Sequence, residues 1–300
     1  MDERKKPKRL HRGDRVDATW VRNLDGMHLI IPGMLPHRTA NEAFIRELID
    51  VSAIETYVAE KNAENPQYKY TMYHAILGAI GRTIQMRPRM NRFIMGGRYY
   101  DRHDITFSMI AKKAFTDDGA EGIAILRYDP QSEKGSVQEM HDKLCDFTYK
   151  LRVKDTTDST TGSIDVITKM PSGLVYFFMR LLNKLDQHGH MPWILAKDDP
   201  YNSTVWISNL GSIKLNAGYH HLTDWGSNSI FIVVGERKMT PFYDEAGNVT
   251  MKPALELGLT LDERIADGYY YAKTIRLIKH LLAHPELLDT PCKEELDIEY

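Results

Sequence analysis

The sequence is poor in cysteine, with only Cys145 and Cys292 in 300 residues. Two cysteines exclude a disulfide framework and a cysteine metal cluster. The reducing cytoplasm is therefore the expected compartment. Long hydrophobic runs are missing as well, since the most apolar stretch, "GLVYFFMRLL", is too short for a membrane span and contains Arg180. The basic N-terminus has no apolar segment of the kind that a secretory signal needs, so we expect neither export nor a membrane partner.

A surplus of one charge is also absent. The chain has 39 Lys and Arg, 41 Asp and Glu, and a formal net charge of -2. This balance gives no overall attraction to nucleic acid. Charge gathers only at the ends: residues 1–15 hold seven basic and three acidic residues, and residues 284–300 hold one basic and six acidic residues. We therefore predict a solvated basic tail over 1–18, a single domain over 19–288 and a solvated acidic tail over 289–300.

Local patterns predict an α/β protein, with a large mixed β-sheet flanked by helices. Helices are predicted after Ser52, where Glu55 completes a capping box, from Thr71 to before Pro88, over 137–151, from a Ser172 cap to Gln187, and at the C-terminus. Strands are predicted over 104–110 and 122–127, and in "STVWIS", "SIFIVVGE", "TPFYD" and "VTMKPALELGLTL", with "DEAGN" as a hairpin turn.

The segment "LTLDERIADGYYYAK", residues 259–273, has the form of a site. Leucines at 255, 257, 259 and 261 alternate with polar residues or glycine, which predicts a strand with one apolar face. Glu263 continues the apolar positions. If the strand persists that far, its carboxylate is buried, and burial raises a carboxyl pKa.

Two motifs in this region resemble a known family. "DERIADG" resembles its H-x-x-x-D-G motif, and "WISNLGSI", residues 206–213, resembles its I-S-N-L-G strand, which "FIVVGERK" follows as in that family. The family is the chloramphenicol acetyltransferase-like fold, which includes the catalytic domain of 2-oxo acid dehydrogenase acyltransferase subunits. The likeness covers roughly residues 200–290, and a weaker pattern extends it back to about residue 20.

The resemblance implies acyl transfer between thioesters, or to a hydroxyl, in a channel between the subunits of a trimer. It implies that coenzyme A or acyl-CoA is a substrate and that homotrimers or assemblies of trimers form. Ser208 then matches the residue that hydrogen-bonds the tetrahedral oxyanion. Asp267 matches a structural aspartate that pairs with an arginine, for which "TWVRN" offers Arg22.

The sequence departs from the motif at the residue that acts as the general base in that family, because Glu263 stands where the family has histidine. An ordinary glutamate, near pKa ~4.3, is a weak base toward a thiol near ~8.5, and burial narrows that gap. Glu263 is therefore either a base or a residue that holds structure or ligand. His220 or His221 in "YHHLTDWG" is an alternative source of imidazole, or else the pair is a hydrogen-bonded loop or oligomer contact. Adjacent residues on a strand point to opposite faces, so His220 and His221 cannot easily bind one ion, and we expect no metal site there.

Two hypotheses follow from these motifs. The first is a CoA-dependent acyltransferase with Ser208 as oxyanion donor and Glu263 as base or orienting group. The second is a non-catalytic relative that serves as an oligomeric scaffold or an acyl-CoA binder. Some twenty residues precede the first matched segment, so we expect no lipoyl domain and no covalently bound lipoate. The presence of Ser208 favours the enzyme.

Overall fold

The structure is a computed structural model that describes residues 11–112, 121–152 and 170–299. Its main feature is a seven-stranded mixed sheet in the order β2-β10-β8-β7-β5-β6, with β9 paired to β10. The strands are β2 (Glu42–Asp50), β5 (Ile105–Lys112), β6 (Glu121–Tyr128), β7 (Val205–Asn209), β8 (Ile230–Val234), β9 (Lys238–Tyr243) and β10 (Val249–Asp262). β7 runs parallel to both of its neighbours, and the other pairs are antiparallel. The predicted α/β fold with a large mixed sheet is confirmed.

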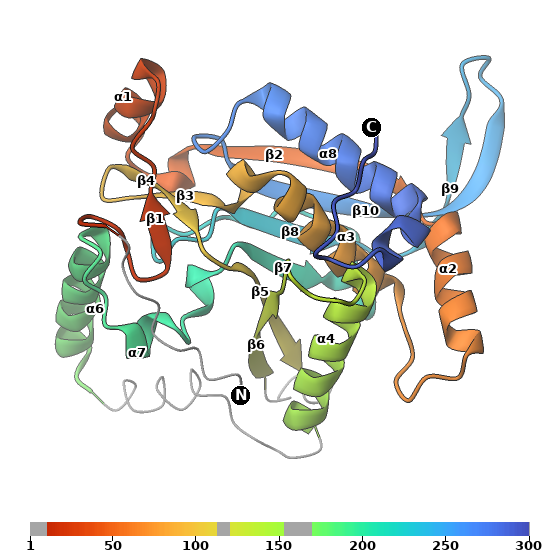
Figure 1. The fold of residues 1–300 in the computed structure, drawn as a ribbon, viewed down its shortest axis with the longest axis horizontal. Coiled ribbons are helices and arrows are strands. Elements are labelled where there is room, and N and C mark those ends of the chain that lie inside the picture. The colour runs from red at the N-terminus through yellow and green to blue at the C-terminus, as the bar shows by residue number, and fades with distance from the viewer. Residues whose placement is uncertain (1–10, 113–120, 153–169, 300) are drawn as a thin grey trace.

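Helices cover one face of this sheet (Figure 1). They are α2 (Ser52–Ala63), α3 (Met72–Met86), α4 (Ser136–Arg152) and α8 (Gly268–Ala283). The four leucines at alternate positions of β10, 255 to 261, are each at most 3% exposed and share a core with residues of α3 and α8. The predicted apolar row is therefore confirmed, and it defines the helical side of the sheet.

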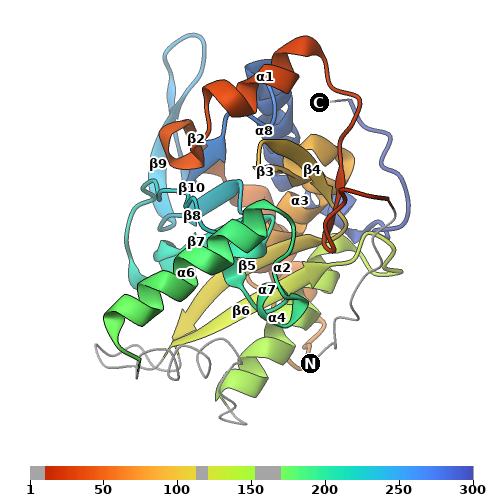
Figure 2. The same ribbon diagram turned by 90° about the vertical axis from the view of Figure 1, so that its left-hand side faces the viewer.

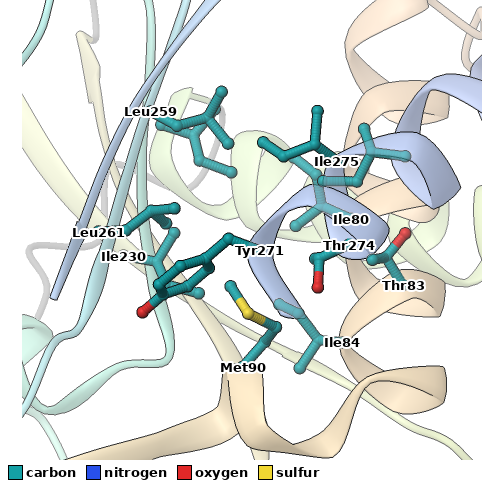
Figure 3. Close-up of a pocket in the computed structure, with 12 residues that line it drawn as sticks. Ile80, Thr83, Ile84, Met90, Ile230, Leu259, Leu261, Tyr271, Thr274 and Ile275 are labelled. Atoms are coloured by element: carbon teal, nitrogen blue, oxygen red, sulfur yellow. The ribbon is translucent and has the colours of Figure 1, made fainter. Parts of the chain in front are cut away.

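The contact between α3, α8 and the sheet leaves a small cavity of about 20 Å³. Figure 3 shows its lining, which is mainly aliphatic and comes from both helices and from β8 and β10. Thr83 lines it and is 1% exposed, and its hydroxyl has no hydrogen-bond partner within the described ranges. The cavity belongs to the core on the helical side of the sheet.

A second group of elements lies at one end of the molecule, on the left in Figure 1 and toward the viewer in Figure 2. It contains a three-stranded sheet of β1 (Ala18–Trp20), β4 (Arg98–Arg102) and β3 (Arg92–Met95), with α1 (Gly26–Met34), α6 (Ser172–Gln187) and α7 (Trp193–Ala196). Both α1 and α6 expose large apolar side chains, namely Met27, Leu29, Ile30 and Met34, and Leu174, Tyr176, Phe177, Phe178, Met179 and Leu181. Short 3-10 turns occur at Arg38–Ala40, Pro88–Asn91, Pro200–Asn202, Leu210–Ile213 and Pro285–Asp289.

Two predicted helix caps are wrong. Ser52 is the first residue of α2, and the cap is Val51, because the Ser52 hydroxyl donates instead to Asp50 at 2.6 Å. Pro171, rather than Ser172, caps α6. Thr71 does cap α3, in a box with His74.

The prediction of solvated ends is also wrong for several described residues. Arg15 is 3% exposed and pairs with Asp186 at 2.7 Å. Cys292 is fully buried, and its carbonyl accepts a hydrogen bond from Arg82 at 2.6 Å. These partners are far away in sequence, so the local charge pattern gave no sign of them. None of the helices within the described ranges is long and apolar enough to cross a bilayer.

Candidate functional site

Ser208 lies near the carboxyl end of the parallel strand β7. Its neighbour Ile207 belongs to the core beneath the helices, so the Ser208 side chain points to the opposite face of the sheet. The residue is half-buried, and its hydroxyl makes no hydrogen bond to another described residue. That hydroxyl is therefore free to donate to a bound group.

Glu263 follows the last residue of β10 and lies in a turn. Its backbone N–H donates to the carbonyl of Asn41 at 3.0 Å, and its side chain is exposed in the single chain. The prediction that Glu263 continues the buried row is wrong, because the strand ends one residue earlier. The desolvation that was expected to make it a stronger base is absent from the single chain.

The buried carboxylate at this point belongs to Asp262, which is fully buried. Its two oxygens accept hydrogen bonds from Nε and Nη2 of Arg264, both at 2.7 Å, and Arg38 lies 3.4 Å away. Such bidentate geometry fixes the direction of both side chains. The outer residues of the "DER" triplet, Asp262 and Arg264, are the sequence signal for this cluster, whereas the predicted site uses only the middle residue, Glu263.

Arg38 connects this cluster to residues 220–226. Its Nη1 donates to the carbonyl of Thr223 at 2.8 Å, and its backbone N–H donates to Asp224 at 2.9 Å. Burial raises the pKa of Asp224, but hydrogen bonds from Thr39 and from the Arg38 N–H outweigh burial and lower that pKa. The end of β10 and the loop that bears the two histidines are therefore held together.

Asp267 caps α8, and its carboxylate accepts a hydrogen bond from the N–H of Tyr270 at 2.8 Å. The predicted pair with Arg22 is wrong, because Arg22 binds Asp14 at 3.0 Å instead. The exposed position of Asp267 suits a cap, which satisfies a free N–H group in the first turn of a helix.

His220 and His221 lie in an irregular segment, and both are exposed. The expectation that they point to opposite faces of a strand is wrong, because their rings stack at 4.5 Å. The His220 ring also stacks on Phe231 of β8 at 4.1 Å, with 9° between the planes. Phe231 is stacked in turn beside Trp206 of β7, so His220 lies over the face that carries Ser208. In the described parts of the chain, no group of three or more His, Cys, Asp or Glu residues is placed to hold a metal ion.

A polar hollow of about 280 Å³ opens on this same face. It is lined by Arg46, Asn216, Ala217, Gly218, Tyr219, Glu256 and Gly258. Gly258 is in register with Val233, and Val233 is in register with Ser208. The hollow therefore begins two strands away from Ser208, in the same row across the sheet.

Comparison with known protein families gives a match. The family model for the 2-oxoacid dehydrogenases acyltransferase (catalytic domain) matches residues 182–289. No curated protein matches the chain by sequence. The matched range includes Ser208, His220, Glu263 and Asp267.

Three solved structures illustrate the likeness in fold. The cubic core of the pyruvate dehydrogenase multienzyme complex has a TM-score of 0.57 and 15% identity over 89% of this chain and 93% of that chain. The dihydrolipoamide acetyltransferase of Azotobacter vinelandii has a TM-score of 0.58 and 16% identity over 89% and 93%. The structure of that enzyme was determined to investigate the role of a serine, a histidine and an asparagine in its catalytic mechanism. A chloramphenicol acetyltransferase has a TM-score of 0.52 and 11% identity over 88% and 99%. The chain therefore has the chloramphenicol acetyltransferase-like fold, and its residues 182–289 match the acyltransferase catalytic domain of 2-oxoacid dehydrogenases.

Proposed function

We propose that this protein is a coenzyme A-dependent acyltransferase, which moves an acyl group from a thioester to a thiol or hydroxyl acceptor at a site between chains. The family match over residues 182–289 and the fold support the class of reaction. In this proposal the acceptor supplies a thiol or a hydroxyl group, either as a small molecule or on another protein.

The observation that carries the proposal is the state of Ser208. Ser208 is half-buried near the end of a strand, and its hydroxyl has no partner among the described residues, which supports a role in stabilising a negative oxygen as it forms. Donors of this kind act in the transition state because they are already oriented when the charge develops. A serine that only ended a strand would be expected to bond to nearby backbone, as Ser212 does to the carbonyl of Asn209 at 2.7 Å.

The sheet geometry supports a site made from two chains. Ser208 is in register with Val233 and then Gly258, and Glu263 lies five positions beyond Gly258. Strand spacing of about 4.8 Å and a rise of about 3.3 Å per residue put the Cα atoms of Ser208 and Glu263 roughly 19 Å apart in one chain. Both side chains can approach one carbonyl only if they come from different copies.

Exposed apolar surface on α1 and α6 supports this assembly. Soluble monomers rarely expose clusters of large apolar side chains unless the surface binds something. Phe177 and Tyr176 of α6 are 61% and 71% exposed, and Leu29 of α1 is 69% exposed. We take the occupant to be a second copy of this chain, in a trimer or an assembly of trimers. The cubic core among the structural neighbours supports this choice.

The test is a mass-resolved assay of purified protein, with a panel of acyl-CoAs and small thiol, amine and hydroxyl acceptors. The expected result is release of free coenzyme A with a matching acylated acceptor. Ser208→Ala should lower kcat by about 10²–10³-fold, as loss of one oxyanion donor does. Ser212→Ala, an exposed serine nearby, is the control and should not change kcat.

Two outcomes would contradict the proposal. If the protein binds acyl-CoA and turns over none of the panel, it is the non-catalytic acyl-CoA binder. If Ser208→Ala and Ser212→Ala are equally active, the Ser208 hydroxyl does not stabilise the transition state.

A further inference from the structure

His220 is held on the outer face of the sheet by contacts on both sides of it in the chain. On one side, Gly218 lies against β10 so closely that a Cβ on Gly258 would come within 2.0 Å of the Gly218 carbonyl oxygen. On the other side, Leu222 is 1% exposed, and its N–H donates to the Glu42 carboxylate. The ring between these anchors is therefore in a fixed place although it is exposed.

The hydrogen bond of His220 defines which ring nitrogen carries the proton. Its Nδ1 lies 3.0 Å from the carbonyl oxygen of His221. A carbonyl oxygen can only accept, so Nδ1 must be the donor, and in the neutral ring Nε2 is left with its lone pair. Stacking on Phe231 at 4.1 Å fixes the plane of the ring. His220 is thus an oriented imidazole with Nε2 available as a base.

His220 is also the candidate base that is near Ser208 within one chain. Phe231 is in register with Trp206, two positions before Ser208. The same strand spacings put the Cα atoms of Phe231 and Ser208 about 8 Å apart, with the His220 ring stacked on Phe231. Glu263 of the same chain is roughly 19 Å from Ser208, so a glutamate at this position could reach the same carbonyl only from another copy. A substrate carbonyl beside Ser208, with the attacking acceptor atom next to that carbonyl, fits the space between Ser208 and the His220 ring.

We infer that His220 is the general base of the acyl transfer, in place of the histidine that the 263 position lacks; this inference rests on the proposed function. Nε2 takes the proton of the acceptor S–H or O–H as that sulfur or oxygen bonds to the thioester carbonyl carbon. The Ser208 hydroxyl donates to the resulting oxyanion. The intermediate then breaks its carbon–sulfur bond, and the departing coenzyme A thiolate takes the proton from the imidazolium. The products are the acylated acceptor and free coenzyme A.

The experiment compares His220→Ala with His188→Ala, with the acyl-CoA and acceptor pair that the parent turns over best. His188 is a matched control because it is exposed and its Nδ1 makes the same kind of contact, to the Lys184 carbonyl at 2.7 Å. We expect His220→Ala to lose about 10²–10⁴-fold in kcat, the usual range for a general base. Added imidazole should restore part of that loss, and acyl-CoA affinity measured by calorimetry should stay within about threefold. His188→Ala should match the parent, with or without imidazole.

Each other outcome has a defined meaning. If His220→Ala is as active as the parent, or loses activity that imidazole does not restore while it stays folded, His220 is not the base and the acyltransferase proposal still stands. If Glu263→Gln alone loses 10²-fold or more and His220→Ala does not, the base is Glu263. If the parent transfers no acyl group to any acceptor, both proposals are wrong.

Discussion

Replacing Asp262 with asparagine removes a negative charge that faces two buried guanidinium groups. Both carboxylate oxygens accept from Arg264 at 2.7 Å, and Arg38 lies 3.4 Å away, with all three residues at most 3% exposed. The asparagine amide keeps the size of the side chain, but its NH₂ group cannot accept from an arginine. Breaking one side of a buried ion pair typically costs about 3–5 kcal/mol. Arg264 keeps its bond to the carbonyl of Leu35, and Arg38 keeps several carbonyl partners, so we expect the lower end, about 3 kcal/mol.

This loss converts into a measurable change in melting temperature. An unfolding entropy of about 2.1 cal/mol/K per residue gives about 0.6 kcal/mol/K for a chain of this length, so Tm should fall by about 5 °C. The assay is thermal unfolding followed by circular dichroism. Protein concentration must be equal for all variants, because assembly shifts the apparent stability.

Asp267→Asn is the matched control. Asp267 is an exposed cap, and asparagine caps a helix about as well as aspartate does, so Tm should stay within about 1 °C of the parent. Equal shifts for the two variants, or a folded Asp262→Asn protein with the Tm of the parent, would refute the assignment of the buried pair to Asp262.

Three other predictions follow from the core and from α6. Burial and then the nearby His141 lower the pKa of His74 to about 4, which favours the neutral ring in the folded state. The free energy of unfolding should therefore fall by up to roughly 3 kcal/mol as the pH drops from about 6.5 to 4, and His74→Gln, which keeps a cap acceptor, should flatten that slope in urea titrations at several pH values. Thr83→Val replaces the unpartnered hydroxyl at the cavity in Figure 3 with a methyl group of similar size, so the free energy of unfolding should rise by about 1 kcal/mol, and a decrease would show that the hydroxyl is satisfied. Phe177→Asp places a charge in the exposed apolar face of α6, so the mass measured by light scattering should fall below that of three chains, with an unchanged circular dichroism spectrum. An unchanged mass would show that α6 is not part of the interface.

Much of the fold could be predicted because its signals are local. The alternation along β10, the helical spacing of α4 and the turn between β9 and β10 all appear in windows of a few residues, and each element is present. The edge strand β2 was missed. Its sequence, "EAFIRELID", mixes charged residues with apolar ones on both faces, so it has no clear alternation.

The site was harder to predict because its contacts join distant parts of the chain. The Ser208 motif gave the right strand, and the role of that serine stays a prediction. β10 ends at Asp262, which contacts both Arg264 and the distant Arg38. A count of alternating positions that continues past this end places Glu263 in the core by mistake. The orientation of His220 depends on Phe231 and on the neighbouring carbonyl, which the adjacent histidines alone do not show.

The buried ion pair between Asp262 and Arg264, which flank position 263, has a consequence for how freely that position can vary. Asp262 and Arg264 are buried and bound to each other, while the side chain of Glu263 between them is exposed and its backbone N–H donates to Asn41. The side chain at position 263 can therefore be substituted without disturbing the buried Asp262–Arg264 pair. Surface substitutions of this kind usually change the free energy of unfolding by no more than about 0.5 kcal/mol. A full set of substitutions at this position, with histidine and glutamate as two of its members, would therefore report any effect of the side chain on activity separately from effects on folding.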